Sequence, residues 1–588
     1  MQRTAADVPK LSNGRTAIAA SSWRVHAALG AILILGATLR TAGLSYGLPA
    51  VYNPDEVAIM TRALSFAKGD LNPHNFLYPT AYFYALFGWT GAYFAASWIT
   101  GSVESLSAFQ AAFFTDPSSV YLAGRLMGVV AGTATVVLIF AVANRLFGAA
   151  AGLAAAFFLA ASPIHVVDSH YVKHDVATTL AIAAAFILTL RVWPFGRGRE
   201  GRLRRAAVAG LACGLALSTH YYAVFATVPL AIAIWLANWP ENWRGAAGAL
   251  ALAAVAAAAG FFALSPFILV EPATAWRDIV ANRQIVVDRA LIAAGPFANA
   301  RRYAELLWLD TLGWPAMILA LAGSARLSLV APRRALLLSA FPIAFLLFIV
   351  NTVAASRYLN PVVPFAALFA GYAVSWLSAL SPARAPVAIG LSLVAATPAV
   401  VQCVRADALF RQDDTRTLAK RFIEERVPEG AGIALQPYSV PLAPTRESLA
   451  ETLAAKLGSL EALPAKFEMQ LAAEPWPSPS YRLTYIGDGG LDADKYYVSY
   501  SELGGSSGLE ALRRRGVEYV VLKRLKAHPP ATQPFIEALE REGALLATFS
   551  PYGPAAEHVE PFLHNTDARI SRNLERPGPV VEVWQLRR

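Results

Sequence analysis

Two adjacent acids, Asp55 and Glu56, stand in the stretch Tyr52-Asn-Pro-Asp-Glu, directly after the first long apolar segment. A carboxylate beside an apolar surface has its pKa raised by desolvation, which suits a general base. The two acids could equally be solvated residues of an ordinary loop. Which hypothesis holds depends on the other polar residues that share their side of the protein.

A third acid, Asp175, ends the polar stretch that begins at Ser162 and separates two apolar segments. Two acids beside one cleft could have different roles, since one can take a proton while the other orients a sugar hydroxyl. Alternatively, Asp175 caps a helix that begins at Val176, because Asp is a favoured N-cap residue. The two roles do not exclude each other.

Three histidines in the same stretch, His165, His170 and His174, suggest a metal site together with nearby acids. His170 and His174 are four residues apart and would share one face of a helix. The chain lacks a His-Glu-x-x-His motif, and contacts to a sugar or to the membrane surface explain the histidines as well. We expect that no cofactor is required, while a divalent metal stays open.

Arg357 and Tyr358 stand where a polar loop enters an apolar segment. An arginine at this place can bind a phosphate in a bidentate manner and keeps its charge. It could also anchor the helix at the membrane interface, a role that the adjacent tyrosine fits. Acids for a base and an arginine for a phosphate, in an apolar chain, indicate a substrate that is both lipidic and phosphorylated.

The composition indicates a polytopic membrane protein, because 56% of the 588 residues are hydrophobic and only 15% are charged. The net charge of +10 does not indicate nucleic-acid binding, since the arginines fall mostly in short loops between apolar segments. Cys213 and Cys403 lie within or at the end of apolar runs, so we expect core packing rather than a disulfide.

A membrane span needs about 20 apolar residues, and the chain offers about eleven candidates. They are residues 23–45, 119–143, 146–164, 174–193, 205–220, 221–239, 246–266, 304–324, 334–353, 359–380 and 385–403. The arginine-rich loop 191–205, the arginines at 326, 333, 334 and 384, and a tail of residues 1–22 should be cytoplasmic. The first span should remain as an uncleaved anchor.

These orientations place Asp55 and the stretch 165–175 on the same, outer side, so an even number of crossings must separate them. Three apolar stretches lie between them: 79–99, 119–143 and 146–164. We predict that 79–99 does not cross, because it is rich in Tyr and Trp, which favour the interface. It would lie in the outer leaflet as part of an outer loop, residues 46–118. The alternative is that 79–99 is an ordinary span and that a further crossing lies around 105–115.

Residues 404–588 are predicted to form a small α/β domain on the outer side, after a membrane domain at 23–403. A helix is expected at Asp414–Glu425, and strands at Gly432–Leu435, Tyr519–Leu522, Ala544–Phe549 and Val580–Leu586. Residues 440–510 are rich in Pro, Gly, Ser and Ala and are expected to be an insertion or a loop-rich region.

The order of these motifs resembles the GT-C glycosyltransferases, in particular the group of protein O-mannosyltransferases and lipid A aminoarabinose transferases. The resemblance is carried by Asn53-Pro-Asp-Glu, Tyr78-Pro, Arg125-Leu-Met-Gly, Asn144-Arg-Leu-Phe-Gly, Ser162-Pro-Ile-His, Ser169-His, Asp175, Arg357-Tyr-Leu-Asn-Pro, Pro364 and the end of the chain from Gly578. Leu77-Tyr-Pro-Thr departs from the Lys-Pro-Pro type of segment of the lipid A branch, so the acceptor is not assigned.

The resemblance implies transfer of a sugar from a polyprenyl-phosphate donor to an acceptor hydroxyl, with inversion, at the outer face of the inner membrane. Asp55 would be the base, with Glu56 and Asp175 as further catalytic acids, and Arg357 would neutralise the phosphate. The helix at 79–99 would help to seat the prenyl tail. The remaining expected substrate contacts are Tyr358, His170, Lys173, Tyr78 and His220.

The acceptor would be a glycan, a lipid or a protein, and membrane lipid is the other expected partner. A polysaccharide ligase or a transporter of lipid-linked sugars remains an alternative, although no internal repeat or matching pair of broken segments is visible. A non-catalytic membrane scaffold is the third hypothesis, and it predicts no dependence on Asp55.

Overall fold

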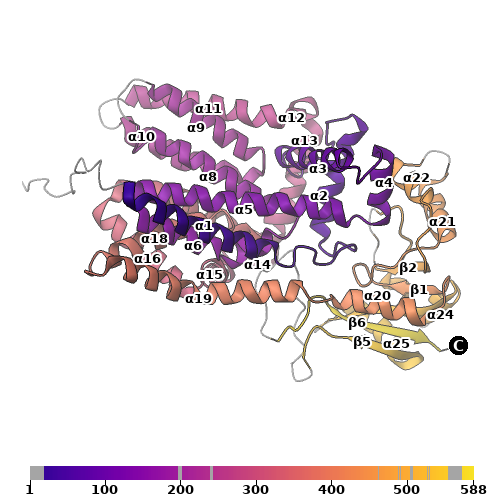
Figure 1. The fold of residues 1–588 in the computed structure, drawn as a ribbon. Coiled ribbons are helices and arrows are strands. Elements are labelled where there is room, and N and C mark those ends of the chain that lie inside the picture. Colours follow the sequence, from indigo (N-terminus) through magenta and orange to yellow (C-terminus); the bar gives the residue numbers. More distant parts are fainter. Residues whose placement is uncertain are drawn as a thin grey trace, which may run out of the picture.

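The structure is a computed structural model that describes residues 19–196, 201–238, 243–460, 463–487, 489, 492–503, 508–525, 528, 530–553 and 573–587. It has a long bundle of helices and, at one end of it, a smaller part built on a sheet (Figure 1). The predicted tail up to residue 18 and the arginines at 197 and 199 lie outside the described residues.

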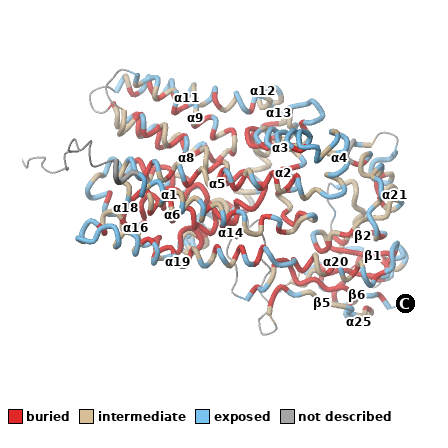
Figure 2. The backbone as a smooth tube through the Cα atoms, viewed as in Figure 1, coloured by how far each residue is buried: buried red, intermediate tan, exposed pale blue. Residues whose placement is uncertain are grey.

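The bundle is formed by long helices that run roughly side by side (Figure 1). They are α1 (Ala19–Thr41), α5 (Ser118–Phe147), α6 (Ala149–Ala160), α8 (His174–Val192), α9 (Arg202–Leu217), α10 (Thr227–Asn238), α11 (Trp243–Leu264), α16 (Trp314–Val330), α17 (Pro332–Ile349), α18 (Val363–Ser378) and α19 (Arg384–Phe410). Buried residues concentrate in the central helices α6 and α18, whereas α11 turns a largely exposed apolar surface outward, as lipid contact requires (Figure 2).

Further helices, among them the 19-residue α3, and 3₁₀ or π turns connect the helices of the bundle. They are α2 (Pro54–Leu64), η1 (Ser65–Lys68), α3 (Ala81–Ile99), α4 (Leu106–Thr115), α7 (Pro163–Asp168), η2 (Tyr221–Ala226), α12 (Phe267–Val270), α13 (Pro272–Arg283), η3 (Gln284–Asp288), α14 (Arg289–Ala294), α15 (Ala300–Leu306), η4 (Leu307–Thr311) and η5 (Ser356–Leu359). Helices α2, α3, α4, α12 and α13 gather at the end of the bundle that faces the sheet (Figure 1).

The predicted fold class, a helical polytopic membrane protein with a small C-terminal α/β part, is confirmed. Among the described residues, six helices are long and apolar enough to cross a membrane, or seven if the pair around the 106° bend before α16 counts as one span. The sequence windows suggested more spans because they merged short helices with the apolar turns beside them. Helix α6, for instance, has 12 residues and α18 has 16. Helix α3 is not among the six, and its position in the outer leaflet stays a prediction.

The C-terminal part is a six-stranded sheet in the order β3-β2-β1-β4-β6-β5. Its strands are β1 (Gly432–Leu435), β2 (Arg482–Ile486), β3 (Tyr497–Val498), β4 (Val517–Arg524), β5 (Gly543–Phe549) and β6 (Val580–Leu586). The first four are parallel, and β6 pairs in antiparallel fashion with β4 and β5. Alternate residues of β4 enter two separate cores, Tyr519 and Val521 on one face and Val520 and Leu522 on the other.

Helices cover both faces of this sheet, α20 (Thr415–Arg426) on one face and α23 (Tyr500–Leu503), α24 (Gly508–Arg513) and α25 (Gln533–Glu542) on the other. The turn η6 (Pro530–Thr532) precedes α25, and α21 (Arg446–Leu457) and α22 (Ala465–Leu471) pack on each other in a separate cluster. All four predicted strands and the predicted helix are present. Residues 440–510 are not simply a loop-rich region, because the described ones include β2, β3 and three short helices.

Helices α9 and α11 pack backbone against backbone. Gly210 and Gly214, spaced as in the small-xxx-small motif of membrane helices, face the carbonyl groups of Ala253 and Ala257 on α11. A Cβ atom on either glycine would overlap one of these carbonyl oxygens, so only glycine permits this approach.

We predict that Gly214→Ala lowers the free energy of unfolding by about 1–3 kcal/mol, the cost of overpacking a close contact. Gly248→Ala on α11 is the matched control, because nothing lies within 4 Å of its added Cβ, and it should be neutral or slightly stabilising. Unfolding in mild detergent measures both variants. Equal effects would show that the contact between α9 and α11 does not limit stability.

Candidate functional site

Asp55 occupies the first turn of α2. The helix begins there because Asn53 is its N-cap, accepting the backbone N–H of Asp55 at 3.1 Å, and Pro54 holds the first helical position. The carboxylate lies 3.4 Å from Lys173 Nζ and 3.6 Å from Arg357 Nη1. Three segments that are distant in the sequence therefore bring one acid and two cations together.

The charge environment of Asp55 differs from the one that the sequence suggested. Burial acts to raise its pKa, but attraction to Lys173 and Arg357 outweighs this effect and lowers the pKa from 3.8. The expected rise is therefore wrong for the protein without substrate, because a carboxylate between two cations is stabilised as the anion. Asp55 is ionised at neutral pH, but it is a weak base while both cations are in place.

Glu56, the second acid of the pair, points away from this cluster into the protein. Its two carboxylate oxygens accept hydrogen bonds from Arg125 Nε at 2.9 Å and Nη2 at 2.8 Å. The same carboxylate accepts the backbone N–H of Val172 at 2.9 Å. Because all these contacts are directed into the protein, Glu56 positions the segments on either side of it. The predicted catalytic role of Glu56 stays a prediction.

Two more acids, Asp168 and Asp175, lie near the same cations. Asp168 accepts a hydrogen bond from Asn360 Nδ2 at 2.6 Å, and burial raises the pKa of Asp168 to about 6. Asp175 does not cap α8, as the alternative hypothesis held, because the helix begins at His174 with Lys173 at the N-cap. Within the described part of the chain, the buried Asp175 Oδ1 and Arg357 Nη1 have no hydrogen-bond partner.

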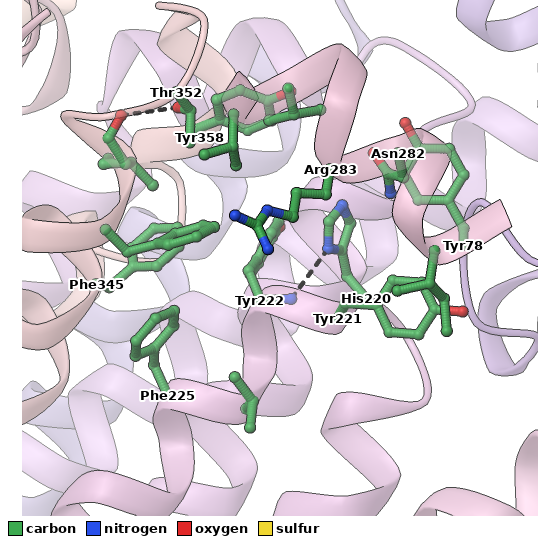
Figure 3. A pocket seen from close by; sticks show the side chains of 16 residues that line it. Tyr78, His220, Tyr221, Tyr222, Phe225, Asn282, Arg283, Phe345, Thr352 and Tyr358 are labelled. Carbon is green, nitrogen blue, oxygen red and sulfur yellow. Dashed lines mark hydrogen bonds between the residues drawn. The ribbon is translucent and has the colours of Figure 1, made fainter. Parts of the chain in front are cut away.

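A cavity of about 520 Å³ adjoins this cluster. Tyr358 and Tyr78 link the two, because Tyr358 lies under the Arg357 guanidinium at 5.2 Å and the Tyr78 ring lies 4.5 Å from His174. Figure 3 shows polar side chains, Arg283 and His220 among them, pointing into the space. Its apolar wall comes from η2, η3 and α17 through Val224, Phe225, Val286, Val287, Phe345, Phe348 and Ile349.

The helix predicted at 79–99, which was expected to seat the prenyl tail, does not form this apolar wall. Tyr78, just before α3, lines the cavity, whereas the residues of α3 itself do not. An apolar space of this size with a few polar groups at one end is typical of a site for a ligand with an apolar part.

The histidines of the stretch that begins at Ser162 do not come together around one point. The two ring nitrogens of His170 face the backbone carbonyls of Val166 and Ala42, at 2.9 and 3.0 Å, and His165 Nδ1 accepts from Arg40. His170, predicted to bind substrate, is thus held by backbone. His220 does line the cavity and accepts the Tyr222 N–H at 3.3 Å. Over the described residues, no group of three His, Cys, Asp or Glu side chains is arranged to hold a metal.

Sequence reasoning did not assign Arg125, Asn282 or Arg283 to the site. The place of Arg125 within a long apolar segment, which forms helix α5, indicates such a role, because a charge in an apolar segment needs a partner. Arg283 and Asn282 sit at the end of α13 beside the π turn η3, and nothing in their sequence context marks that turn.

Residues 106–269 match the model of a family described as dolichyl-phosphate-mannose-protein mannosyltransferase. No curated protein matches the sequence. The matched segment contains Arg125, Lys173, Asp175 and His220, and it ends before Arg357. Over this segment, which is less than half of the chain, the match bears out the predicted resemblance to the O-mannosyltransferase group.

Several solved structures are similar to this chain. ArnT from Cupriavidus metallidurans, bound to undecaprenyl phosphate, has a TM-score of 0.49 and 13% identity over 96% of this chain and 98% of that one. An oligosaccharyltransferase from Archaeoglobus fulgidus, in complex with Zn and sulfate, has a TM-score of 0.47 and 14% identity over 84% of this chain and 68% of that one. The arabinofuranosyltransferase AftD from Mycobacteria has a TM-score of 0.35 and 14% identity over 96% of this chain and 41% of that one.

We predict that Arg125→Met destabilises the protein by about 3–5 kcal/mol, because it leaves the Glu56 carboxylate buried without a partner. Arg421→Met is the matched control. Arg421 pairs with Asp413 at 2.7 Å in an exposed position, and the loss of such a pair costs about 0–1 kcal/mol. Chemical unfolding in mild detergent measures the free energy of unfolding of both variants. Similar losses in the two would contradict the view that the ion pair between Glu56 and Arg125 holds the structure together.

A second prediction follows from the lowered pKa of Asp55. Its ion pairs stabilise the folded protein above the pKa of the unfolded state, about 3.9, and this contribution is lost as the pH falls through the lower folded pKa. Wild type should therefore be more stable than Asp55→Asn near neutral pH, and the difference should shrink below about pH 4. Thermal unfolding across this range measures it, and a difference that grows in acid would contradict the assignment.

Proposed function

We propose that this protein transfers a sugar from a polyprenyl-phosphate donor to an acceptor hydroxyl, with inversion at the anomeric carbon. The observation that carries the proposal is the convergence of Asp55, Lys173 and Arg357 beside an apolar cavity of about 520 Å³. The description of the matched family names a donor of the same chemistry, a sugar on a polyprenyl phosphate.

The donor would bind in two parts. Its prenyl chain would occupy the apolar side of the cavity, next to Phe225 and Phe345 (Figure 3). Its phosphate would lie against Lys173, which is buried, and Arg357, which is half-buried. Within the described structure, Lys173 Nζ and Arg357 Nη1 are buried atoms with no hydrogen-bond partner, so both can donate to it. Arg283 and His220 line the same space and provide further donors to phosphate or sugar oxygens.

The reaction would be a single displacement. The acceptor oxygen attacks the anomeric carbon while Asp55 takes the proton from that hydroxyl. The bond from the anomeric carbon to the phosphate oxygen breaks, and its electron pair stays on the phosphate. Arg357 and Lys173 stabilise the charge that develops there, and Asp175 orients a sugar hydroxyl. One displacement inverts the configuration.

Donor binding would also activate the base. Without donor, Lys173 and Arg357 hold the pKa of Asp55 below its usual value. A phosphate that takes up these two cations weakens their attraction for Asp55, so its pKa rises and it becomes a better proton acceptor. The base would therefore gain strength only when the leaving group is in place.

We propose that the site faces the periplasmic side of the inner membrane. Helix α8 carries Asp175 in its first turn, at the site, and Arg191 in its last turn, about 24 Å further along the helix. Helix α17 carries Arg333 in its first turn and ends at Ile349, which lines the cavity. The arginine-bearing ends of these helices thus lie across the bundle from the site, as the positive-inside rule requires for an outer active site.

The test is release of polyprenyl phosphate from polyprenyl-phosphate mannose, glucose, galactose or arabinose by the purified protein, with water or an added neutral saccharide as the hydroxyl that takes the sugar. We expect release with at least one donor, and a loss of about 10²–10⁴-fold in Asp55→Asn, the usual contribution of a general base. Asp116→Asn, an exposed acid after α4, should keep the wild-type rate.

A binding measurement separates catalysis from donor recognition. Asp55→Asn should still bind undecaprenyl phosphate, whereas Arg357→Met should bind it about 10- to 100-fold more weakly because a charge-assisted contact is lost. A folded Asp55→Asn variant that releases product at the wild-type rate would remove Asp55 as the base and favour a scaffold or a transporter.

A further inference from the structure

A second cavity, of about 160 Å³, lies between the loop before α2 and the C-terminal sheet. Residues 50–52 line it from the bundle side, and the sheet contributes residues that follow or end its parallel strands. In particular, Leu435 ends β1, and Tyr485 lies one residue before the end of β2. The carboxyl ends of parallel strands are the usual ligand-binding edge of an α/β sheet.

The lining of this cavity is unusually rich in tyrosine, with Tyr52, Tyr438, Tyr485 and Tyr497 around it. Tyr485 and Tyr497 lie next to each other, with their ring centres 5.6 Å apart. Tyr438 is 65% exposed and has a backbone φ of +61°, a conformation that non-glycine residues rarely adopt and that persists mostly at functional positions.

The two cations that line the cavity, Arg416 and Lys495, are each paired with a carboxylate. Arg416 makes two hydrogen bonds to Asp414, at 2.7 and 2.8 Å, and Lys495 lies 2.9 Å from Asp492. The cavity thus offers aromatic faces and phenol groups but little free charge. This chemistry suits a neutral carbohydrate, whose C–H faces pack on aromatic rings while its hydroxyls hydrogen-bond at the edges. A phosphate or an acidic ligand would need unpaired cations.

The cavity is also close to the proposed catalytic base. Tyr52 precedes Asp55 by three residues, so their Cα atoms are at most about 11 Å apart. The volume is below the roughly 300–1,000 Å³ of sites that enclose a whole drug-sized ligand, so it would hold one part of a longer chain.

We propose that this cavity, which we call the tyrosine cavity, holds the non-reacting part of a neutral saccharide acceptor and presents the chain to Asp55. The proposal rests on the proposed glycosyl transfer and names its acceptor class. The C-terminal part of the protein is then a specificity element, because it contributes three of the four tyrosines.

The test is titration of the full-length protein in detergent with neutral trisaccharides of mannose, glucose and galactose, followed by saturation-transfer NMR. Wild type and Asp55→Asn should both bind at least one of them. Tyr438→Ala and Tyr497→Ala should bind roughly five- to ten-fold more weakly, and Tyr438→Phe, which keeps the ring, should retain most of the affinity. Leu545→Ala, an exposed position on the opposite edge strand β5, is the control and should bind like wild type.

Failure of this proposal is distinct from failure of the proposed function. Absence of binding to all three trisaccharides, or equal binding by the tyrosine variants, overturns the tyrosine cavity as an acceptor site. Release of polyprenyl phosphate with water as the acceptor requires no saccharide, so it tests cleavage of the sugar–phosphate bond independently of the tyrosine cavity. Binding that depends on Tyr438, in a protein that releases no polyprenyl phosphate either with water or with the bound saccharide as acceptor, would leave the cavity a saccharide site and remove the transfer reaction.

Discussion

Glu56 and Arg125 form a bidentate ion pair shielded from solvent, and each partner also binds the backbone of another segment. Arg125 donates to the carbonyl oxygens of Leu44 and Tyr46 at 2.7 Å, and Glu56 accepts from Val172. One interaction thereby joins α5, the loop before α2, α2 itself and the loop before α8. Asp55 and Lys173 are immediate neighbours of Glu56 and Val172, so the pair fixes the geometry in which base and cation meet.

The charges around the site explain why an anionic substrate fits beside several acids. Asp55, Asp168 and Asp175 interact with the two cations Lys173 and Arg357, and burial raises the pKa of Asp168. A phosphate would add further negative charge, which is tolerable only if it takes over contacts from a carboxylate. Competition between phosphate and Asp55 for the same cations follows from this balance, and it links donor binding to the strength of the base.

The sequence predicted those features that depend on local pattern or on membrane sidedness. The predicted bounds of strands β1 and β6 agree with the structure to the residue, because short apolar runs between turn residues mark them. Asp55 and Arg357 were placed on one face from the distribution of arginines alone. Strand β2 is not among the predicted strands, because its Arg-Leu-Thr-Tyr-Ile run stands in a segment rich in Pro and Gly.

Other features could not be predicted, because they arise from contacts between distant segments. The partner of Glu56 lies 69 residues away, and the two cations that reverse the expected pKa shift of Asp55 come from two further segments. Burial alone predicts a raised pKa for a carboxylate, and only the positions of Lys173 and Arg357 decide the sign. The cavity could not be predicted for the same reason, since its wall combines three segments that are distant in the sequence, η2, η3 and α17.

The C-terminal part is joined to the site by side chains of the loop that carries Asp55. Tyr46 donates to Asp414 at 2.8 Å, Tyr52 is hydrogen-bonded to Thr417 at 2.7 Å, and the Arg416 guanidinium stacks 3.8 Å from the Tyr52 ring. Asp414 is the N-cap of α20, so these bonds fix the loop to the first turn of a helix that packs on the sheet. A domain that only shielded the site would need no such contacts three residues from the base. The loop is therefore held from two sides, by Arg125 within the bundle and by α20 outside it, and the position of Asp55 depends on both.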